Sequence, residues 1–289
     1  TEHPSVLGPI RELGARGWVV REVDVGPDGT VRLDELGKAM HPGVDLVSVM
    51  MANNETGTVQ PVAEIVELAH SHGAVVHCDA AQGVGKLPLD VSDLGVDLLA
   101  FSGHKICGPK GVGVLYIRRR RPLLELRPQL LGGGQEGRLR SGTVNVPGAV
   151  GLARAVELAV AELDDESARA ANLRDRFEAR VTGSLDGVHR NAGPVRLPGT
   201  SNLSFAGIDG HALIASLPDV AVSSGSACTA IHSGPSPVLV AMGVPSQLAA
   251  ASLRFSLGRF TTSAEVDRAA DRVIEEVTRL RARRKRRRR

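Results

Sequence analysis

The chain has 289 residues, of which 42% are hydrophobic and only 2% are aromatic. This length supports one large or two modest domains, and Val, Leu, Ile and Ala must fill the core. No apolar run reaches the roughly 18 residues that a membrane-spanning helix needs. The three cysteines are too far apart for a CxxC pair, which argues against a disulfide framework and a common zinc site and favours a reducing cytoplasm.

The basic charge of the chain is concentrated at its end. Eight of the 35 Lys and Arg lie in the last nine residues, RARRKRRRR, which leaves 27 basic against 32 acidic residues elsewhere. Such a run can bind phosphate backbones nonspecifically. More often it is a solvated, disordered tail, and here it has no aromatic residues on which bases could stack. We therefore expect no main role in nucleic-acid binding.

The first 120 residues alternate between short apolar runs and a helical pattern. The pattern predicts strands over residues 45–51, 74–78, 96–101 and 111–117, and a helix over 61–71. Strands that alternate with helices indicate an α/β fold with a mostly parallel sheet covered on both faces.

The second half of the chain has a different organisation. Residues 145–183 are largely helical and contain a domain junction. Beyond residue 185 the pattern is α+β, with strands over 200–205 and 220–223, a helix from about residue 210 and a last helix over 263–281. We expect a large domain over 1–160, a smaller α+β domain over 161–280 and a basic tail over 281–289.

Polar side chains follow three of the predicted strands. They are Asn53-Asn54, Asp79 and the run Ser102-Gly103-His104-Lys105. In open α/β sheets, ligands bind beyond the carboxyl ends of the strands. The three strand ends therefore outline a binding site.

Lys105 and Asp79 have a chemical explanation as well as an ordinary one. A lysine is usually a solvated surface charge, and an aspartate at a strand end often caps the next helix. A desolvated lysine, however, can form a Schiff base with an aldehyde. A carboxylate can keep a pyridine nitrogen protonated. Together, at adjacent strand ends, they are the two groups that a pyridoxal-phosphate (PLP) enzyme needs.

Cys228 lies in a run of Ser, Gly, Ala and Thr that cannot pack a core. A cysteine is most often a small buried hydrophobe. This run instead indicates an exposed loop, where a thiol can ionise and act as a nucleophile. We interpret Cys78, at a strand end, and Cys107, at a Gly-Pro turn, as structural.

The motifs taken together resemble those of the cysteine desulfurases, PLP enzymes of the class V aminotransferase fold. The resemblance runs from residue 1 to about residue 280. It rests on six segments: Asn53-Asn54-Glu55-Thr56-Gly57, His77-Cys78-Asp79-Ala80-Ala81-Gln82, Ser102-Gly103-His104-Lys105, Arg140-Ser141-Gly142-Thr143, Ser223-Ser224-Gly225-Ser226-Ala227-Cys228-Thr229 and Leu253-Arg254-Phe255-Ser256-Leu257-Gly258-Arg259. It implies a PLP-dependent transferase fold and a homodimer.

The resemblance also implies roles for single residues in the reaction. Lys105 would hold the cofactor and move the Cα proton of L-cysteine, and Cys228 would receive the sulfur as a persulfide. His3 would stack on the cofactor ring and assist proton transfer, although alone it would pass for an ordinary surface histidine. Asn54 and Arg254 would hold the substrate carboxylate.

Further residues would bind the cofactor by the same resemblance. Asp79 would pair with the pyridine nitrogen and Gln82 with the ring hydroxyl. Ser102 and His104 would contact the phosphate, and Thr143 would reach the phosphate of the other subunit. No metal ligand is implied.

Several alternatives stay open from the sequence. The nearest are a class V transaminase and a selenocysteine lyase, and the sulfur acceptor is not identified: an iron–sulfur scaffold or a tRNA-thiolation protein would both suit. The chain starts at TEHPSVLGPI, without an initiator Met or a secretory signal. The phosphate-binding turn of the family would lie upstream of Thr1. We therefore expect that the beginning is missing and that residues 1–289 alone bind PLP weakly, or are an inactive fragment.

Overall fold

The computed structural model describes residues 1–119, 124–224 and 234–287. Contacts divide the chain into two units. The sheet unit comprises His41–Met51 and Val62–Leu163, and the C-terminal unit comprises Thr1–Met40, Ala52–Pro61 and Asp164–Arg289. The chain passes from one unit to the other at Leu163, inside the stretch in which a junction was predicted. The three-part division at residues 160 and 280 stays a prediction.

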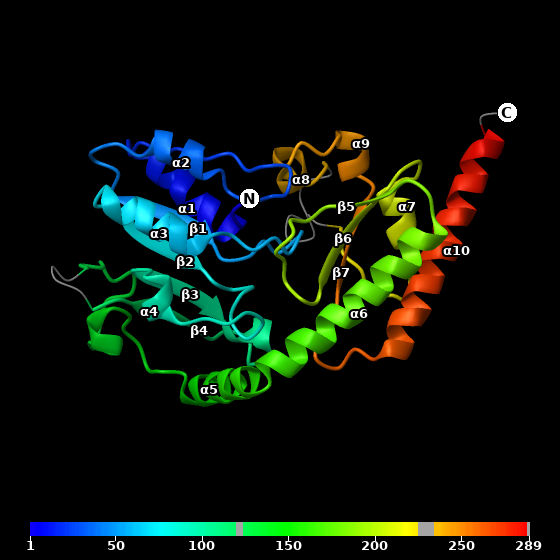
Figure 1. Ribbon diagram of the computed structural model, residues 1–289. Helices are drawn as coiled ribbons and strands as arrows, with labels where there is room; N and C mark the ends of the chain where they lie inside the picture. Colours follow the sequence, from blue (N-terminus) through cyan, green and yellow to red (C-terminus); the bar gives the residue numbers. More distant parts are fainter. Residues whose placement is uncertain (120–123, 225–233, 288–289) are drawn as a thin grey trace. The chain divides into compact units, whose positions relative to one another are not determined.

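The sheet unit contains a four-stranded sheet in the order β1-β2-β3-β4. Strands β1 (Leu46–Met50), β2 (Val75–Asp79) and β3 (Leu98–Ser102) are parallel, and β4 (Gly113–Ile117) is antiparallel to β3. The prediction of a mostly parallel sheet is confirmed. In Figure 1 this sheet is coloured from cyan to green. Its helices are α3 (Val62–Ser71), α4 (Val91–Leu94) and α5 (Val146–Ala161).

Local sequence explains why α3 forms where it does, and a buried carboxylate ties it to the sheet. Helix α3 buries Val62, Ile65, Val66 and Ala69, which recur at helical spacing. A buried carboxylate then links three elements of this unit. Asp97 Oδ2, just before β3, is 2.8 Å from His70 Nε2 on α3 and accepts a hydrogen bond of 2.9 Å from the backbone N–H of Val76 on β2.

The C-terminal unit is built on an antiparallel sheet in the order β5-β6-β7. Its strands are β5 (Val188–Arg190), β6 (Thr200–Phe205) and β7 (Ser252–Ser256). Its helices are α1 (Pro4–Ala15), α2 (Leu33–Ala39), α6 (Leu163–Ser184), α7 (Gly210–Ala215), α8 (Pro237–Ala241), α9 (Ser246–Ala249) and α10 (Ser263–Arg287).

Helices α6 and α10 lie side by side and share a core with this sheet (Figure 1). Val181 of α6, Leu253 of β7 and Val273 of α10 are all fully buried in it. On the surface, Arg176 of α6 forms a bidentate ion pair with Asp267 of α10 at 2.6 and 2.7 Å. The apolar faces and the charged edges therefore hold the two helices in one register.

Two expectations for this unit are wrong. The last helix continues to Arg287 instead of ending at residue 281, because Arg, Lys and Ala are all strong helix formers. No strand forms over residues 220–223, where an isolated bridge joins Ser223 to Arg254. Within the described residues, no helix has both the length and the apolar content to cross a membrane.

Candidate active site

Lys105 lies on a short 3-10 turn, Gly103–Ile106, that directly follows β3. The turn is fixed by its backbone: the N–H of Gly103 donates to the carbonyl of Val112 at 3.0 Å. Ile106 is buried against Leu152 of α5. The Lys105 side chain is exposed, so burial does not desolvate its amine, while hydrogen bonds and packing hold the backbone that carries it.

Glycine is required at one position of this turn, Gly103, and again just after it, at Gly108. A Cβ added at Gly103 would lie 3.1 Å from the carbonyl oxygen of Pro109, and one added at Gly108 would lie 2.9 Å from the carbonyl oxygen of Gly103. A side chain at either position would push the backbone away from α5. The sequence around Lys105 therefore encodes the tight packing that holds the lysine at the strand end.

Asp79 ends β2, next to β3 in the sheet. Its Oδ1 accepts a hydrogen bond of 2.9 Å from the N–H of Ala81, while its Oδ2 has no partner among the described residues. Gln82 accepts a hydrogen bond of 2.8 Å from Lys86 through Oε1, which leaves its Nε2 donor for a ligand. Because β2 and β3 are parallel, the predicted neighbourhood of Asp79 and the Lys105 turn is confirmed.

His77 precedes Asp79 by two residues on the same strand. Burial lowers the pKa of His77, and the nearby carboxylate of Asp79 opposes this shift. Its Nδ1 lies 2.9 Å from Ser48 Oγ on β1. Sequence reasoning gave His77 no role of its own, and its contact with Ser48 joins the two strands.

The remaining residues of the sheet unit that the sequence singled out differ in their exposure. Ser102 is half-buried at the end of β3, whereas His104 and Thr143 are exposed. Cys78 is buried, as expected for a structural cysteine, but Cys107 is exposed and has a φ of 61°. Burial therefore supports the structural interpretation for Cys78 and not for Cys107.

Asn54 lies in a rigid turn of the C-terminal unit. The side chain of Asn53 holds this turn, because its Oδ1 accepts hydrogen bonds of 2.9 Å from the N–H groups of Glu55 and Thr56. Asn53 Nδ2 donates to the carbonyl of Thr1 at 3.0 Å. His3 caps helix α1, with its Nδ1 accepting from the N–H of Ser5 at 3.2 Å.

Arg254 on β7 contacts this turn. Its Nη1 donates to the carbonyl of Asn54 at 2.7 Å. Its Nε is buried and has no hydrogen-bond partner in the described part of the chain. A buried donor without a partner is costly, and the Nε edge of a guanidinium matches a carboxylate. The structure brings Arg254 to Asn54, and the guanidinium edge that remains suits a substrate carboxylate. That these two residues bind the carboxylate stays a prediction.

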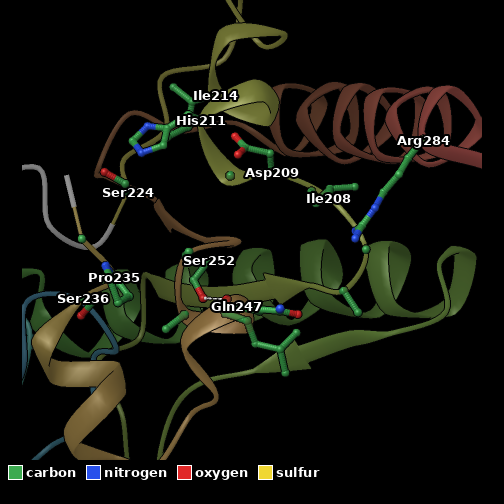
Figure 2. A pocket seen from close by; sticks show the side chains of 17 residues that line it. Ile208, Asp209, His211, Ile214, Ser224, Pro235, Ser236, Gln247, Ser252 and Arg284 are labelled. Atoms are coloured by element: carbon green, nitrogen blue, oxygen red, sulfur yellow. Dashed lines mark hydrogen bonds between the residues drawn. The ribbon is translucent and has the colours of Figure 1, made fainter. Parts of the chain in front are cut away.

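Cys228 lies outside the described residues. The chain on either side of that stretch borders a pocket of about 620 Å³ in the C-terminal unit. Figure 2 shows Ser224 and Ser236 at this pocket, with Asp209, His211 and Arg284. Sequence reasoning missed Glu55 and Ser236, which form a buried hydrogen bond of 2.5 Å. The only sequence signal for Glu55 was its place in the Asn53–Gly57 segment.

The groups of the sheet unit fit PLP. Asp79 offers a carboxylate oxygen to a protonated ring nitrogen, Gln82 offers an N–H to the ring hydroxyl, and Lys105 offers an exposed primary amine on the neighbouring strand end. These are the functional groups by which proteins bind and tune this cofactor. Ser102 and His104 have side chains that can donate to a phosphate.

Comparisons with known proteins agree with this chemistry. The family model described as aminotransferase class V matches residues 1–269. A cysteine desulfurase, IscS, of Anaeromyxobacter sp. (strain Fw109-5) is 48% identical over 97% of this chain and 70% of its own length. The chain spans 61% of the mouse cysteine desulfurase, at the same identity.

Solved structures give the same result. A NifS-like protein matches with a TM-score of 0.86 and 39% identity, over 96% of this chain and 73% of the other. SspA, solved in complex with cysteine, matches with a TM-score of 0.77 and 35% identity, over 90% of this chain and 72% of the other. The chain therefore belongs to the cysteine desulfurases of the aminotransferase class V family.

Proposed function

We propose that this protein is a PLP-dependent cysteine desulfurase that converts L-cysteine to L-alanine and leaves the sulfur on Cys228 as a persulfide. The observation that carries the proposal is the placement of Asp79 and the Lys105 turn at the ends of two adjacent parallel strands. Incubation of the whole gene product with PLP and L-cysteine tests it: alanine should be released, and mass spectrometry should find one added sulfur on Cys228.

PLP, when bound, supplies an electron sink for the charge that develops at the substrate Cα. Asp79 would keep the ring nitrogen protonated and Gln82 would donate to the ring hydroxyl. Lys105 Nζ would hold the cofactor and carry the Cα proton, and His3 would assist that transfer. Ser102 and His104 would bind the phosphate, and Thr143 would reach the phosphate site of a second subunit.

The rest of the reaction belongs to the substrate-binding groups and the thiol. Arg254 and Asn54 hold the substrate carboxylate. The Cys228 thiolate attacks the substrate sulfur, a new S–S bond forms, and the electrons of the broken C–S bond stay on carbon, which takes up protons to give alanine. The sulfur then passes from Cys228 to an acceptor.

Cys228 distinguishes this activity from a class V transaminase or a selenocysteine lyase. A transaminase has no use for a nucleophilic thiol, so a persulfide on Cys228 excludes it. A lyase would prefer selenocysteine over cysteine as substrate. Comparison of the two substrates by alanine release therefore separates the alternatives.

The wider setting follows from the same proposal. We expect a homodimer, because Thr143 would serve the other subunit, and a cytoplasmic location, because a reducing compartment keeps the Cys228 thiol from being lost to a disulfide. The acceptor would be a sulfur-carrier or iron–sulfur scaffold protein. The names of the IscS relatives favour the second. Co-purification with the tagged protein would identify it.

Replacing Arg254 with Ala should weaken cysteine binding much more than cofactor binding. Loss of hydrogen bonds from a charged donor costs about 2–3 kcal/mol, so the KM for cysteine should rise about 30- to 150-fold. Titration of PLP by absorbance should change little. Arg268→Ala, at an exposed position of α10, is the matched control and should alter neither value. Equal losses of both affinities would instead identify Arg254 as structural.

The basic end of α10 favours a second candidate function. Arg283, Arg284, Lys285 and Arg286 are exposed and form no ion pair within the described residues. With four phosphate contacts, the logarithm of the binding constant for duplex DNA would fall with a slope of about −3.6 against the logarithm of the salt concentration. We expect only this weak, salt-sensitive binding. Fluorescence anisotropy of a labelled DNA duplex measures it, and deletion of residues 282–289 should abolish it. Tight binding at physiological salt would make nucleic acid a principal ligand.

A further inference from the structure

The two ends of the stretch that contains Cys228 are attached to the residues expected to bind the substrate carboxylate. At the first end, Ser223 pairs with Arg254 through backbone hydrogen bonds of 2.7 and 3.2 Å. At the second end, Ser236 Oγ donates to Glu55 Oε2 at 2.5 Å. Glu55 follows Asn54, to whose carbonyl the Arg254 side chain donates. Both attachments therefore lead to the Asn54–Arg254 pair.

Ser236 is itself held firmly. Its Oγ accepts a hydrogen bond of 3.2 Å from the N–H of Leu239 and so caps helix α8, while it donates to Glu55. Leu239 is fully buried in an apolar cluster with Val25 and Met242. A hydroxyl that donates and accepts inside a packed cluster has little freedom to rotate.

Glu55 is equally fixed. Its side chain is buried, and burial raises the pKa of its carboxyl, against which the Ser236 hydrogen bond and the charge of Arg254 act. Its backbone carbonyl accepts from Asn202 Nδ2 on β6 at 3.1 Å, and its N–H donates to Asn53. A buried carboxyl is costly unless it is hydrogen-bonded. Its contact with Ser236 therefore offsets part of the cost of burying this carboxyl.

The chemistry gives this contact a purpose. Cys228 is five residues after Ser223 and eight residues before Ser236. For sulfur transfer, the thiolate must reach a sulfur whose position is set by the grip of Asn54 and Arg254 on the carboxylate. Small errors in such an alignment cost a large part of the rate. Attachment of both chain ends to the carboxylate-binding pair would limit those errors.

We propose that Glu55 is a positioning residue that, through Ser236, fixes the returning end of the Cys228 stretch relative to the substrate carboxylate. The inference rests on the proposed desulfurase function. It assigns Glu55 no contact with substrate or cofactor. Its effect is on the sulfur-transfer step, so substrate affinity should depend on it weakly.

Three variants of the PLP-loaded protein test the inference. Ser236→Ala removes the donor to Glu55, and Glu55→Ala removes the acceptor. Each should lower the kcat of persulfide formation on Cys228 by about 10- to 100-fold, with the KM for cysteine changed by less than about threefold. Glu55→Gln keeps an oxygen acceptor of the same shape and should restore most of the rate. This rescue separates positioning from general damage.

A matched control accounts for the loss of a helix cap. Asp90 caps α4 in the sheet unit by accepting from the N–H of Ser92 at 2.7 Å, outside every site described above. Asp90→Ala should leave kcat and KM close to those of the parent, and thermal unfolding should show whether it and Ser236→Ala lose comparable stability. Parent-like kcat in both Glu55→Ala and Ser236→Ala, or a parallel rise in KM, overturns the inference. A parent that forms no persulfide at all, when expressed as its whole gene product, refutes the proposed function instead.

Discussion

Replacing Lys105 with Ala should abolish cysteine turnover and the visible absorbance of the bound cofactor. In the proposed mechanism, Lys105 supplies both the amine that holds PLP and the base that moves the Cα proton. General acid–base catalysis alone contributes about 10²–10⁴-fold, so the rate should fall by at least that factor. Spectra of the PLP-loaded protein, followed by borohydride reduction and peptide mass spectrometry, measure the attachment directly.

Lys110 provides the matched control for this experiment. It is exposed and lies five residues further along the same glycine-rich turn. Lys110→Ala should keep the absorbance and the turnover of the parent. If Lys105→Ala stays yellow, or if reduction fixes the cofactor to another lysine, the assignment of Lys105 is wrong.

Replacing Cys228 with Ser should leave cofactor binding unchanged and stop sulfur transfer. A hydroxyl is a much poorer nucleophile toward sulfur than a thiolate, whereas the groups that hold PLP lie on other segments of the chain. The PLP absorbance and its response to added cysteine should match those of the parent. Mass spectrometry should find no added sulfur at position 228.

Cys107→Ser controls for the loss of an exposed thiol. Cys107 is exposed like a reactive cysteine, yet the proposed mechanism gives it no role, so this variant should form the Cys228 persulfide at the parent rate. Parent-like alanine release by Cys228→Ser in the presence of cysteine would show that the sulfur goes elsewhere. Loss of the persulfide in Cys107→Ser would identify Cys107 as a participant.

Local pattern in the sequence was sufficient for much of the fold and of the cofactor site. The strands β1 to β4 and helix α3 form where apolar residues recur with the period of a strand or a helix. Asp79 and Lys105 follow such strands directly. Because parallel neighbouring strands bring their carboxyl ends to one edge, position along the chain was enough to place these two residues near each other.

Tertiary structure decided which polar groups meet over long separations. Glu55 and Ser236 are 181 residues apart, and Arg254 is 200 residues from the Asn54 carbonyl that it contacts. It also decided exposure, since Lys105 and Cys107 are both exposed despite their tightly packed turn. Periodicity reports which face of an element is buried, but it does not report which partner a buried carboxyl finds. That partner is set when separate elements pack, because a buried polar group must be hydrogen-bonded wherever the chain brings a donor.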